Sequence, residues 1–119
     1  MAGLFSALFG GGNAGNVHMV PPATVRAWLE NGQAVLIDVR EVDEYAAGRI
    51  AGALNLPLST FDPARLPPVP EGKKLVLHCR SGQRCGMAAA KLVASGYDGE
   101  INRLEGGILG WRAAGCPVL

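Results

Sequence analysis

Apolar stretches alternate with amphipathic ones along most of the chain, and this alternation predicts strands and helices in turn. Ala34–Val39 is a continuous β-rich run, as is typical of a strand buried on both faces. Lys73–His78 is the second strong strand signal, and shorter signals lie at Val17–Val20, Ala53–Leu56 and Glu100–Leu104. We therefore expect about five strands.

The segments between these strands carry helical periodicity instead. Apolar positions at helical spacing predict helices over Ala23–Glu30, Arg84–Ser95 and Gly107–Ala114, and one or two helical turns over Asp43–Ala47. The prolines between residues 63 and 70 predict a connection with at most one helical turn. Regular alternation of strand and helix predicts the α/β class, with a mainly parallel sheet covered by helices on both faces.

The length of 119 residues gives room for one domain. We expect that domain to span residues 17–119 and residues 1–16 to form a flexible N-terminal tail and linker. Leu4, Phe5, Leu8 and Phe9 fall at helical spacing, so two interpretations of the first twelve residues stay open. They are either a weak membrane or partner anchor or a frayed tail, and the missing basic segment argues against a signal peptide.

Charge and cysteine content narrow the classes of function. Eleven Lys and Arg residues against ten Asp and Glu residues give a net charge of +1, which offers no global argument for binding nucleic acid or membranes. Three cysteines without a Cys-x-x-Cys pair fit neither a disulfide scaffold nor a zinc site. No apolar run approaches the roughly 20 residues that span a bilayer. We therefore expect free thiols, no metal and a cytoplasmic location.

The candidate chemistry lies directly after the second strong strand, in the segment that we call the Cys79–Arg84 loop (Cys-Arg-Ser-Gly-Gln-Arg). Ligands of open α/β sheets bind at the carboxyl ends of strands. Backbone N–H groups, the start of the next helix and nearby guanidinium groups all lower a thiol pKa there. The resulting thiolate is the species that attacks electrophilic sulfur. Cys79 is therefore the predicted nucleophile, although a buried structural cysteine is the alternative.

Each neighbour in the loop has a plausible part. Ser81 and Gly82 are small and permit a tight curl, and Gly82 can adopt a positive φ. Arg80 and Arg84 can hold an anionic substrate. The alternative for Arg84 is an inward side chain that braces the loop against a carboxylate such as Asp38 or Glu44.

Four segments resemble, in order and spacing, the motifs of rhodanese domains. They are Leu36–Glu41, Gly48–Ala53, His78–Arg84 and Leu104–Trp111. The resemblance covers roughly residues 17–119 and implies a parallel five-stranded α/β domain. It implies that Cys79 takes a sulfane sulfur from thiosulfate or from a persulfide donor, and passes it to cyanide, a thiol or a protein acceptor. Backbone N–H groups of Arg80, Ser81, Gly82, Gln83 and Arg84 would cradle the persulfide, with no metal or other cofactor.

Other functions and residue roles stay open beside this hypothesis. The chain could be a sulfur carrier that relays a persulfide to a partner protein, or a redox sensor in which Cys85 resolves Cys79 as a disulfide. Cys85 packed in the first helical turn is the alternative to that resolving role. Cysteine-dependent phosphatases carry a Cys-x5-Arg loop, with five residues between the cysteine and the arginine. Only four residues separate Cys79 from Arg84 here, which argues against a phosphatase. Asp38 and Arg40 are predicted to brace the loop, and strand alternation points His78 away from Cys79.

Overall fold

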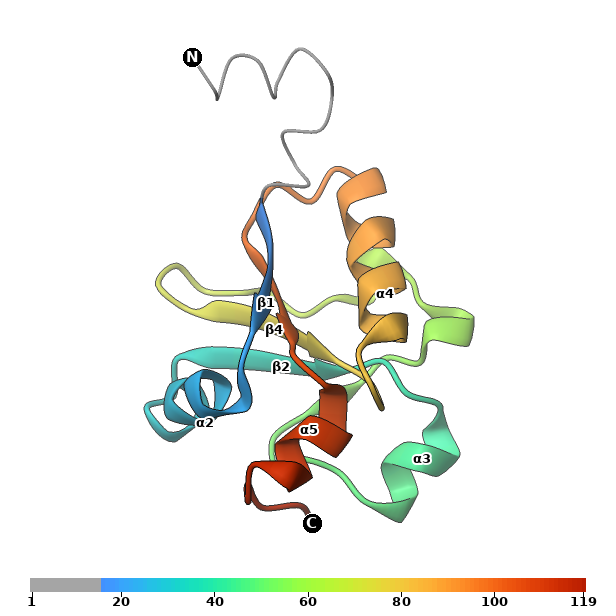
Figure 1. Cartoon of the computed structure of the whole chain (residues 1–119). Coiled ribbons are helices and arrows are strands. Elements are labelled where there is room, and N and C mark those ends of the chain that lie inside the picture. Colours follow the sequence, from blue (N-terminus) through green and yellow to red (C-terminus); the bar gives the residue numbers. More distant parts are fainter. Residues whose placement is uncertain (1–15) are drawn as a thin grey trace.

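The computed structural model describes residues 16–119, so the predictions for the first twelve residues lie outside the described part. Strands and helices alternate along the chain, with two short 3₁₀ turns between β3 and β4 (Figure 1). The strands are β1 (Val17–Val20), β2 (Ala34–Asp38), β3 (Leu54–Asn55), β4 (Lys74–His78) and β5 (Ile101–Leu104). The helices are α2 (Pro22–Glu30), α3 (Val42–Ala47), α4 (Gln83–Ala94) and α5 (Gly107–Ala113).

All five strands form one sheet in the order β1-β5-β4-β2-β3, and every pair is parallel. The predicted α/β class is confirmed, and the sheet is wholly rather than mainly parallel. Each predicted element begins and ends within one residue of the observed one. The 3₁₀ turn at Leu58–Thr60 was not predicted, whereas the turn at Pro63–Arg65 agrees with the single turn expected in the proline-rich connection.

Alternation along the strands divides the core into two layers. Leu36, Val76 and Leu104 face one side of the sheet, where they pack with residues of α2 and α5. Ile37 and Leu77 face the other side, which α4 covers. Figure 1 shows α4 on one side of the sheet and α2 with α5 on the other. Helices therefore cover both faces, as predicted. The carboxyl ends of β2, β4 and β5 remain uncovered by these two layers, and a site can form there.

Candidate active site

Cys79 lies at the carboxyl end of β4, the central strand of the sheet, and the chain then curls sharply into α4. Gly82 allows this curl because its φ of 117° lies in the left-handed region, which costs glycine little. The side chains of Arg80, Ser81 and Gln83 are exposed. The loop therefore presents its backbone inward, toward Cys79, and its polar side chains outward.

The Cys79 sulfur is buried inside this curl, with 1% of the residue exposed. It accepts hydrogen bonds from the backbone N–H groups of Gly82 at 3.1 Å and Cys85 at 3.4 Å. The adjacent Cys85 side chain, followed by the backbone N–H groups of the loop and helix, lowers the pKa of Cys79 to about 5, although burial opposes the shift. Cys79 is therefore a thiolate at neutral pH, the state that a sulfur nucleophile needs.

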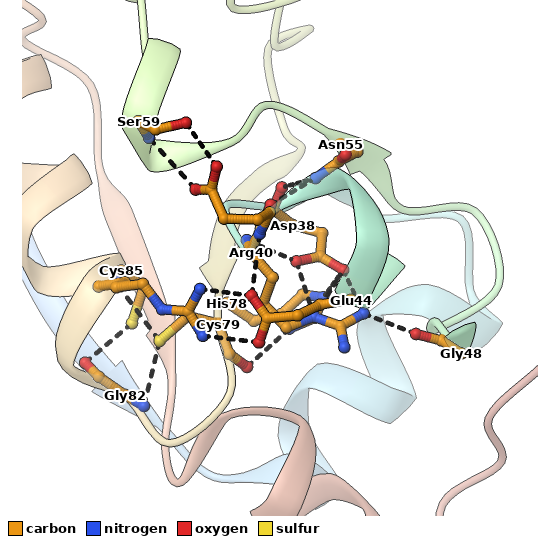
Figure 2. Close-up of polar contacts among 12 residues, drawn as sticks. Asp38, Arg40, Glu44, Gly48, Asn55, Ser59, His78, Cys79, Gly82 and Cys85 are labelled. Carbon is orange, nitrogen blue, oxygen red and sulfur yellow. Dashed lines mark hydrogen bonds and ion pairs between the residues drawn. The ribbon is translucent and has the colours of Figure 1, made fainter. Parts of the chain in front are cut away.

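Cys85 occupies the first turn of α4 beside Cys79. Its thiol donates to the Gly82 carbonyl oxygen at 3.1 Å, and Figure 2 shows the sulfur atoms of Cys79 and Cys85 both facing Gly82. The adjacent Cys79 sulfur, and then burial, raise the pKa of Cys85. Cys85 therefore keeps its proton and remains a hydrogen-bond donor while Cys79 is ionised.

Replacing Cys85 with alanine should raise the pKa of Cys79, because the neighbouring Cys85 side chain is the largest single cause of its lowered value. The wild-type pKa of about 5 lies below the ordinary 9.0, so the change is expected to lower reactivity most between pH 5 and 7. The measurement is the rate of Cys79 alkylation by iodoacetamide against pH, followed by peptide mass. Cys85→Ser, which keeps a donor, is expected to shift the midpoint less. Identical midpoints in wild type and Cys85→Ala would contradict this role.

Arg84 braces the loop against α3. Its guanidinium binds both carboxylate oxygens of Glu44, at 2.6 Å and 2.9 Å. Glu44 also accepts the Glu41 backbone N–H at 3.0 Å, which closes a capping box at the start of α3. Of the partners left open by the sequence, the structure thus pairs Arg84 with Glu44, and Asp38 has another partner. A role for the Arg84 side chain in holding substrate stays a prediction.

Glu44→Gln should destabilise the protein in a way that depends on pH. The Arg84 guanidinium lowers the pKa of Glu44 from 4.5 to about 2. A carboxyl group whose pKa is lower in the folded state stabilises the fold at pH values above its unfolded-state pKa. This stabilisation is lost as the pH falls to its folded-state pKa. We expect a cost of about 1–3 kcal/mol at pH 7, shrinking as the pH falls from about 5 to about 2, in urea unfolding. Asp43→Asn, at an exposed neighbour, is the control, and equal pH profiles for both variants would refute the prediction.

Asp38 and Arg40 form a second brace at the end of β2. The Arg40 guanidinium donates to both Asp38 carboxylate oxygens, and its Nη2 also donates to the Gly48 carbonyl oxygen at 2.7 Å (Figure 2). The Asn55 amide holds the same turn by donating to the carbonyl oxygens of Asp38 and Arg40, each at 2.9 Å. Sequence reasoning missed Asn55, although an amide at the end of a short strand is a usual partner for backbone groups of a neighbouring turn.

His78 lies directly before Cys79, at the end of β4. The side chain is fully buried, with Nδ1 3.2 Å from the Cys79 carbonyl oxygen and Nε2 3.4 Å from an Asp38 carboxylate oxygen. Burial lowers the pKa of His78 more than the Asp38 charge raises it, so the ring is neutral at neutral pH. It contacts the backbone of Cys79 and supports the strand end, in the core position expected from alternation.

Two contacts that the sequence did not predict hold the outer side of the loop. Arg103 of β5 donates from Nη2 to the Gly82 carbonyl oxygen at 2.7 Å. Gly86 makes room for this guanidinium, since a Cβ there would stand 2.8 Å from the same nitrogen. At the start of α5, the Ile108 N–H donates to the Cys79 carbonyl oxygen at 2.9 Å. A glycine inside a predicted helix, such as Gly86, indicates that another group approaches the helix closely, but the sequence does not show which group it is.

Within residues 16–119, no cluster of three or more His, Cys, Asp or Glu side chains is arranged to hold a metal ion. The helices in that part of the chain are all too short or too polar to cross a bilayer. A buried thiolate held by backbone N–H groups, at the mouth of a strand-to-helix turn, can act as a nucleophile toward a small electrophile.

Comparison with known proteins agrees with this geometry. A sulfurtransferase from Allochromatium vinosum is 39% identical over 85 residues, covering 71% of this chain and 78% of that protein. The solved human single-domain sulfurtransferase is 32% identical with a TM-score of 0.63, over 80% of this chain and 95% of that one. A tRNA uridine(34) hydroxylase from Xanthomonas oryzae is 39% identical over 110 residues, which are 82% of this chain.

The chain spans 42% of that hydroxylase's length and 55% of another curated relative, so the same domain also occurs within longer proteins. The family model of the Rhodanese-like domain matches residues 21–114, which include every strand from β2 to β5 and the whole Cys79–Arg84 loop. The parallel sheet, with this loop at the end of β4, agrees with that match. The chain therefore belongs to the rhodanese-like domain family.

Proposed function

We propose that this protein is a sulfurtransferase that carries the transferred sulfur as a persulfide on Cys79. The observation that carries the proposal is the Cys79 sulfur itself, which accepts backbone hydrogen bonds at 3.1 Å and 3.4 Å and has a pKa lowered to about 5. Family membership and the sulfurtransferases among the relatives support the same activity. We propose thiosulfate as the donor, and cyanide, a thiol or a protein thiol as the acceptor.

In the first half-reaction, the Cys79 thiolate attacks the outer sulfur of thiosulfate. A new S–S bond forms to Cys79, the S–S bond of thiosulfate breaks, and its electron pair leaves with sulfite. The products are the Cys79 persulfide anion and sulfite, so charge is conserved and no proton is needed. We expect the loop N–H groups that bind the thiolate to bind the persulfide charge as well, which would lower the barrier electrostatically.

In the second half-reaction, the acceptor attacks the outer sulfur of the persulfide. With cyanide the products are thiocyanate and the Cys79 thiolate, and with a thiolate they are a new persulfide and the Cys79 thiolate. The low pKa of Cys79 makes it a good leaving group in this step. The same hydrogen bonds therefore favour the nucleophile in the first step and its departure in the second.

Loop size favours sulfur over phosphate as the transferred group. Only four residues separate Cys79 from Arg84, and the Arg84 guanidinium is bound by Glu44 in bidentate fashion. A phosphate-binding loop of the Cys-x5-Arg type has one more residue and a free arginine for the phosphate oxygens. Neither condition holds in this protein, so we rank phosphoryl transfer below sulfur transfer.

The decisive experiment is the intact mass of the protein after incubation with thiosulfate, followed by addition of cyanide. We expect a mass gain of one sulfur atom, then its loss with one equivalent of thiocyanate. If thiosulfate leaves the mass unchanged and no thiocyanate forms, thiosulfate is not the donor. A one-sulfur adduct that cyanide does not discharge would instead support a carrier that passes sulfur only to a partner protein.

A redox sensor is the second candidate, favoured by the shared contact of both thiols with Gly82. Cys79 and Cys85 are free thiols in the structure, and a disulfide requires Cα atoms within about 7 Å and converging Cβ atoms. Peroxide treatment distinguishes this function, because an intramolecular disulfide lowers the mass by two hydrogens and resists alkylation. If wild type and Cys85→Ser are oxidised to the same products, the sensor hypothesis is wrong.

A further inference from the structure

Arg103 of β5 reaches the Cys79–Arg84 loop from the neighbouring strand. In the register of β4 with β5 it pairs with Leu77, which faces α4, and paired residues of neighbouring strands point to the same face of a sheet. The Arg103 side chain therefore points toward α4. Its Nη2 donates to the Gly82 carbonyl oxygen at 2.7 Å, at the point where the loop passes into the helix.

The other contacts of this guanidinium do not explain it as a support for the fold. Within residues 16–119 its one hydrogen bond is to Gly82, and no carboxylate pairs with it. The Nε of Arg103 is buried and has no hydrogen-bond partner in that part of the chain. A buried polar group without a partner costs stability. The contact with Gly82 is therefore the feature that a role for Arg103 has to explain.

The guanidinium also lies beside the two thiols of the site. The Cys79 sulfur and burial raise the pKa of Cys85, and the Arg103 guanidinium acts against this rise. The Cys85 thiol donates to the Gly82 carbonyl oxygen at 3.1 Å, so Arg103 and Cys85 share one acceptor. Gly82 in turn donates its N–H to the Cys79 sulfur at 3.1 Å. Arg103 thus holds the residue that binds the thiolate.

This hold matters because the backbone at Gly82 turns easily. Its φ of 117° and ψ of −12° belong to a region that glycine enters at little cost, and glycine has the most conformational freedom of all residues. A trans peptide is planar, so its C=O and N–H point in opposite directions. Holding the Gly82 carbonyl toward Arg103 therefore directs the Gln83 N–H away from Arg103. A rotated peptide would instead offer the thiolate a carbonyl oxygen, which repels it.

Gly86 leaves the space through which Arg103 reaches Gly82. A Cβ at this position would stand 2.8 Å from Nη2 and 3.0 Å from Cζ of Arg103. Gly86 lies inside α4, shortly before the three alanines at 88–90, and glycine is a much weaker helix former than alanine. The glycine therefore weakens the helix locally while it leaves room for the guanidinium beside the loop.

We propose that Arg103 is a positioning residue for the reaction of Cys79. By holding the Gly82 carbonyl away from the sulfur, it keeps the loop N–H groups directed at the thiolate and at the persulfide formed from it. Arg103 acts through Gly82 and forms no bond with the substrate. The inference rests on the proposed function in that it takes Cys79 as the reacting group, but alkylation of Cys79 tests it without any sulfur donor.

Two variants remove the contact by different routes. Arg103→Met deletes the guanidinium, whereas Gly86→Ala displaces it and leaves its charge in the protein. In both, we expect the midpoint of Cys79 alkylation by iodoacetamide to rise by about one pH unit and loading from thiosulfate to be about 10-fold slower, the effect of one hydrogen bond to a charged group. Gly86→Ala should unfold at no lower urea concentration than wild type, since alanine is the better helix former. A purely structural role predicts no such slowing without loss of stability.

Matched variants complete the experiment. Arg103→Lys keeps a charged donor and should restore part of the wild-type alkylation profile, whereas Arg65→Met removes a charge from an exposed 3₁₀ turn and should change nothing. The double variant Arg103→Met/Gly86→Ala should react no more slowly than Arg103→Met alone, because Gly86→Ala acts through the guanidinium. The variants leave unchanged the other titratable groups that interact with Cys79, which are Cys85, Arg84 and His78.

The outcomes separate this inference from the proposed function. If both variants shift the alkylation midpoint while wild type takes no sulfur from thiosulfate, Arg103 positions Cys79 and thiosulfate is not the donor. If wild type loads sulfur and both variants match it in alkylation and loading, the inference is wrong while sulfur transfer stands. If Arg103→Met alone changes the profile, the charge acts on Cys79 without the contact to Gly82, and the inference is again wrong.

Discussion

Cys79→Ser should abolish the one-sulfur adduct with thiosulfate and lower thiocyanate formation by on the order of 10³-fold or more, as loss of a covalent nucleophile does. A serine hydroxyl remains protonated where the thiol is already ionised, because the pKa of Cys79 is about 5. The backbone N–H groups at the site then have no anion to bind. The measurement is the intact mass after thiosulfate treatment, together with the rate of thiocyanate formation.

The controls for this prediction are the other two cysteines. Cys116 lies in the core layer on the opposite face of the sheet from α4, so Cys116→Ser should keep the adduct and near wild-type turnover. The Cys85→Ser variant should still form the one-sulfur adduct, but more slowly below neutral pH. An adduct that survives in Cys79→Ser and disappears in Cys85→Ser would move the nucleophile to Cys85 and overturn the mechanism.

The strands and helices could be predicted from the sequence because short-range patterns determine them. The apolar run of β2, the proline and glycine positions between elements, and the helical spacing in α4 are all local signals. The same holds for the placement of Cys79, since a loop that follows a buried strand of a parallel sheet lies at the carboxyl edge. The tight turn at Ser81 and Gly82 could also be predicted, because it depends on the small size of these two neighbouring residues.

The contacts around the loop could not be predicted in the same way, because they join segments that are distant in the chain. Arg84 had several possible partners in the sequence, and only the position of α3 against the loop selects Glu44. Arg103 reaches Gly82 because β5 pairs with β4 and Gly86 leaves the space open. Such choices depend on how the elements pack, and the sequence lists the candidates without ranking them.

Gly107 shows how a motif can be visible in the sequence while its physical reason is not. It lies in the segment Leu104–Trp111 that resembles the family's closing motif. In the structure its φ is +59°, and a Cβ at this position would overlap the Arg80 carbonyl and stand 2.6 Å from the Cys79 carbonyl oxygen. The glycine therefore lets α5 lie directly on the backbone of the nucleophile.

Gly107→Ala should accordingly destabilise the protein by about 3 kcal/mol, as positive φ costs about 1 kcal/mol and overpacking against backbone 1–3 kcal/mol. Gly115→Ala is the matched control, because Gly115 also has a positive φ of +79° but a Cβ there would meet nothing within 4 Å. We expect a loss of about 1 kcal/mol for this control in urea unfolding.

The two variants should also differ in the site. An alanine at 107 has to push the Arg80 and Cys79 carbonyls away, which breaks the bonds from the start of α5 and moves the sulfur relative to its N–H donors. Alkylation of Cys79 should then show a raised pKa in Gly107→Ala and an unchanged one in Gly115→Ala. Equal losses of stability and equal alkylation profiles would mean that only backbone conformation matters at Gly107, and that α5 does not set the position of the nucleophile.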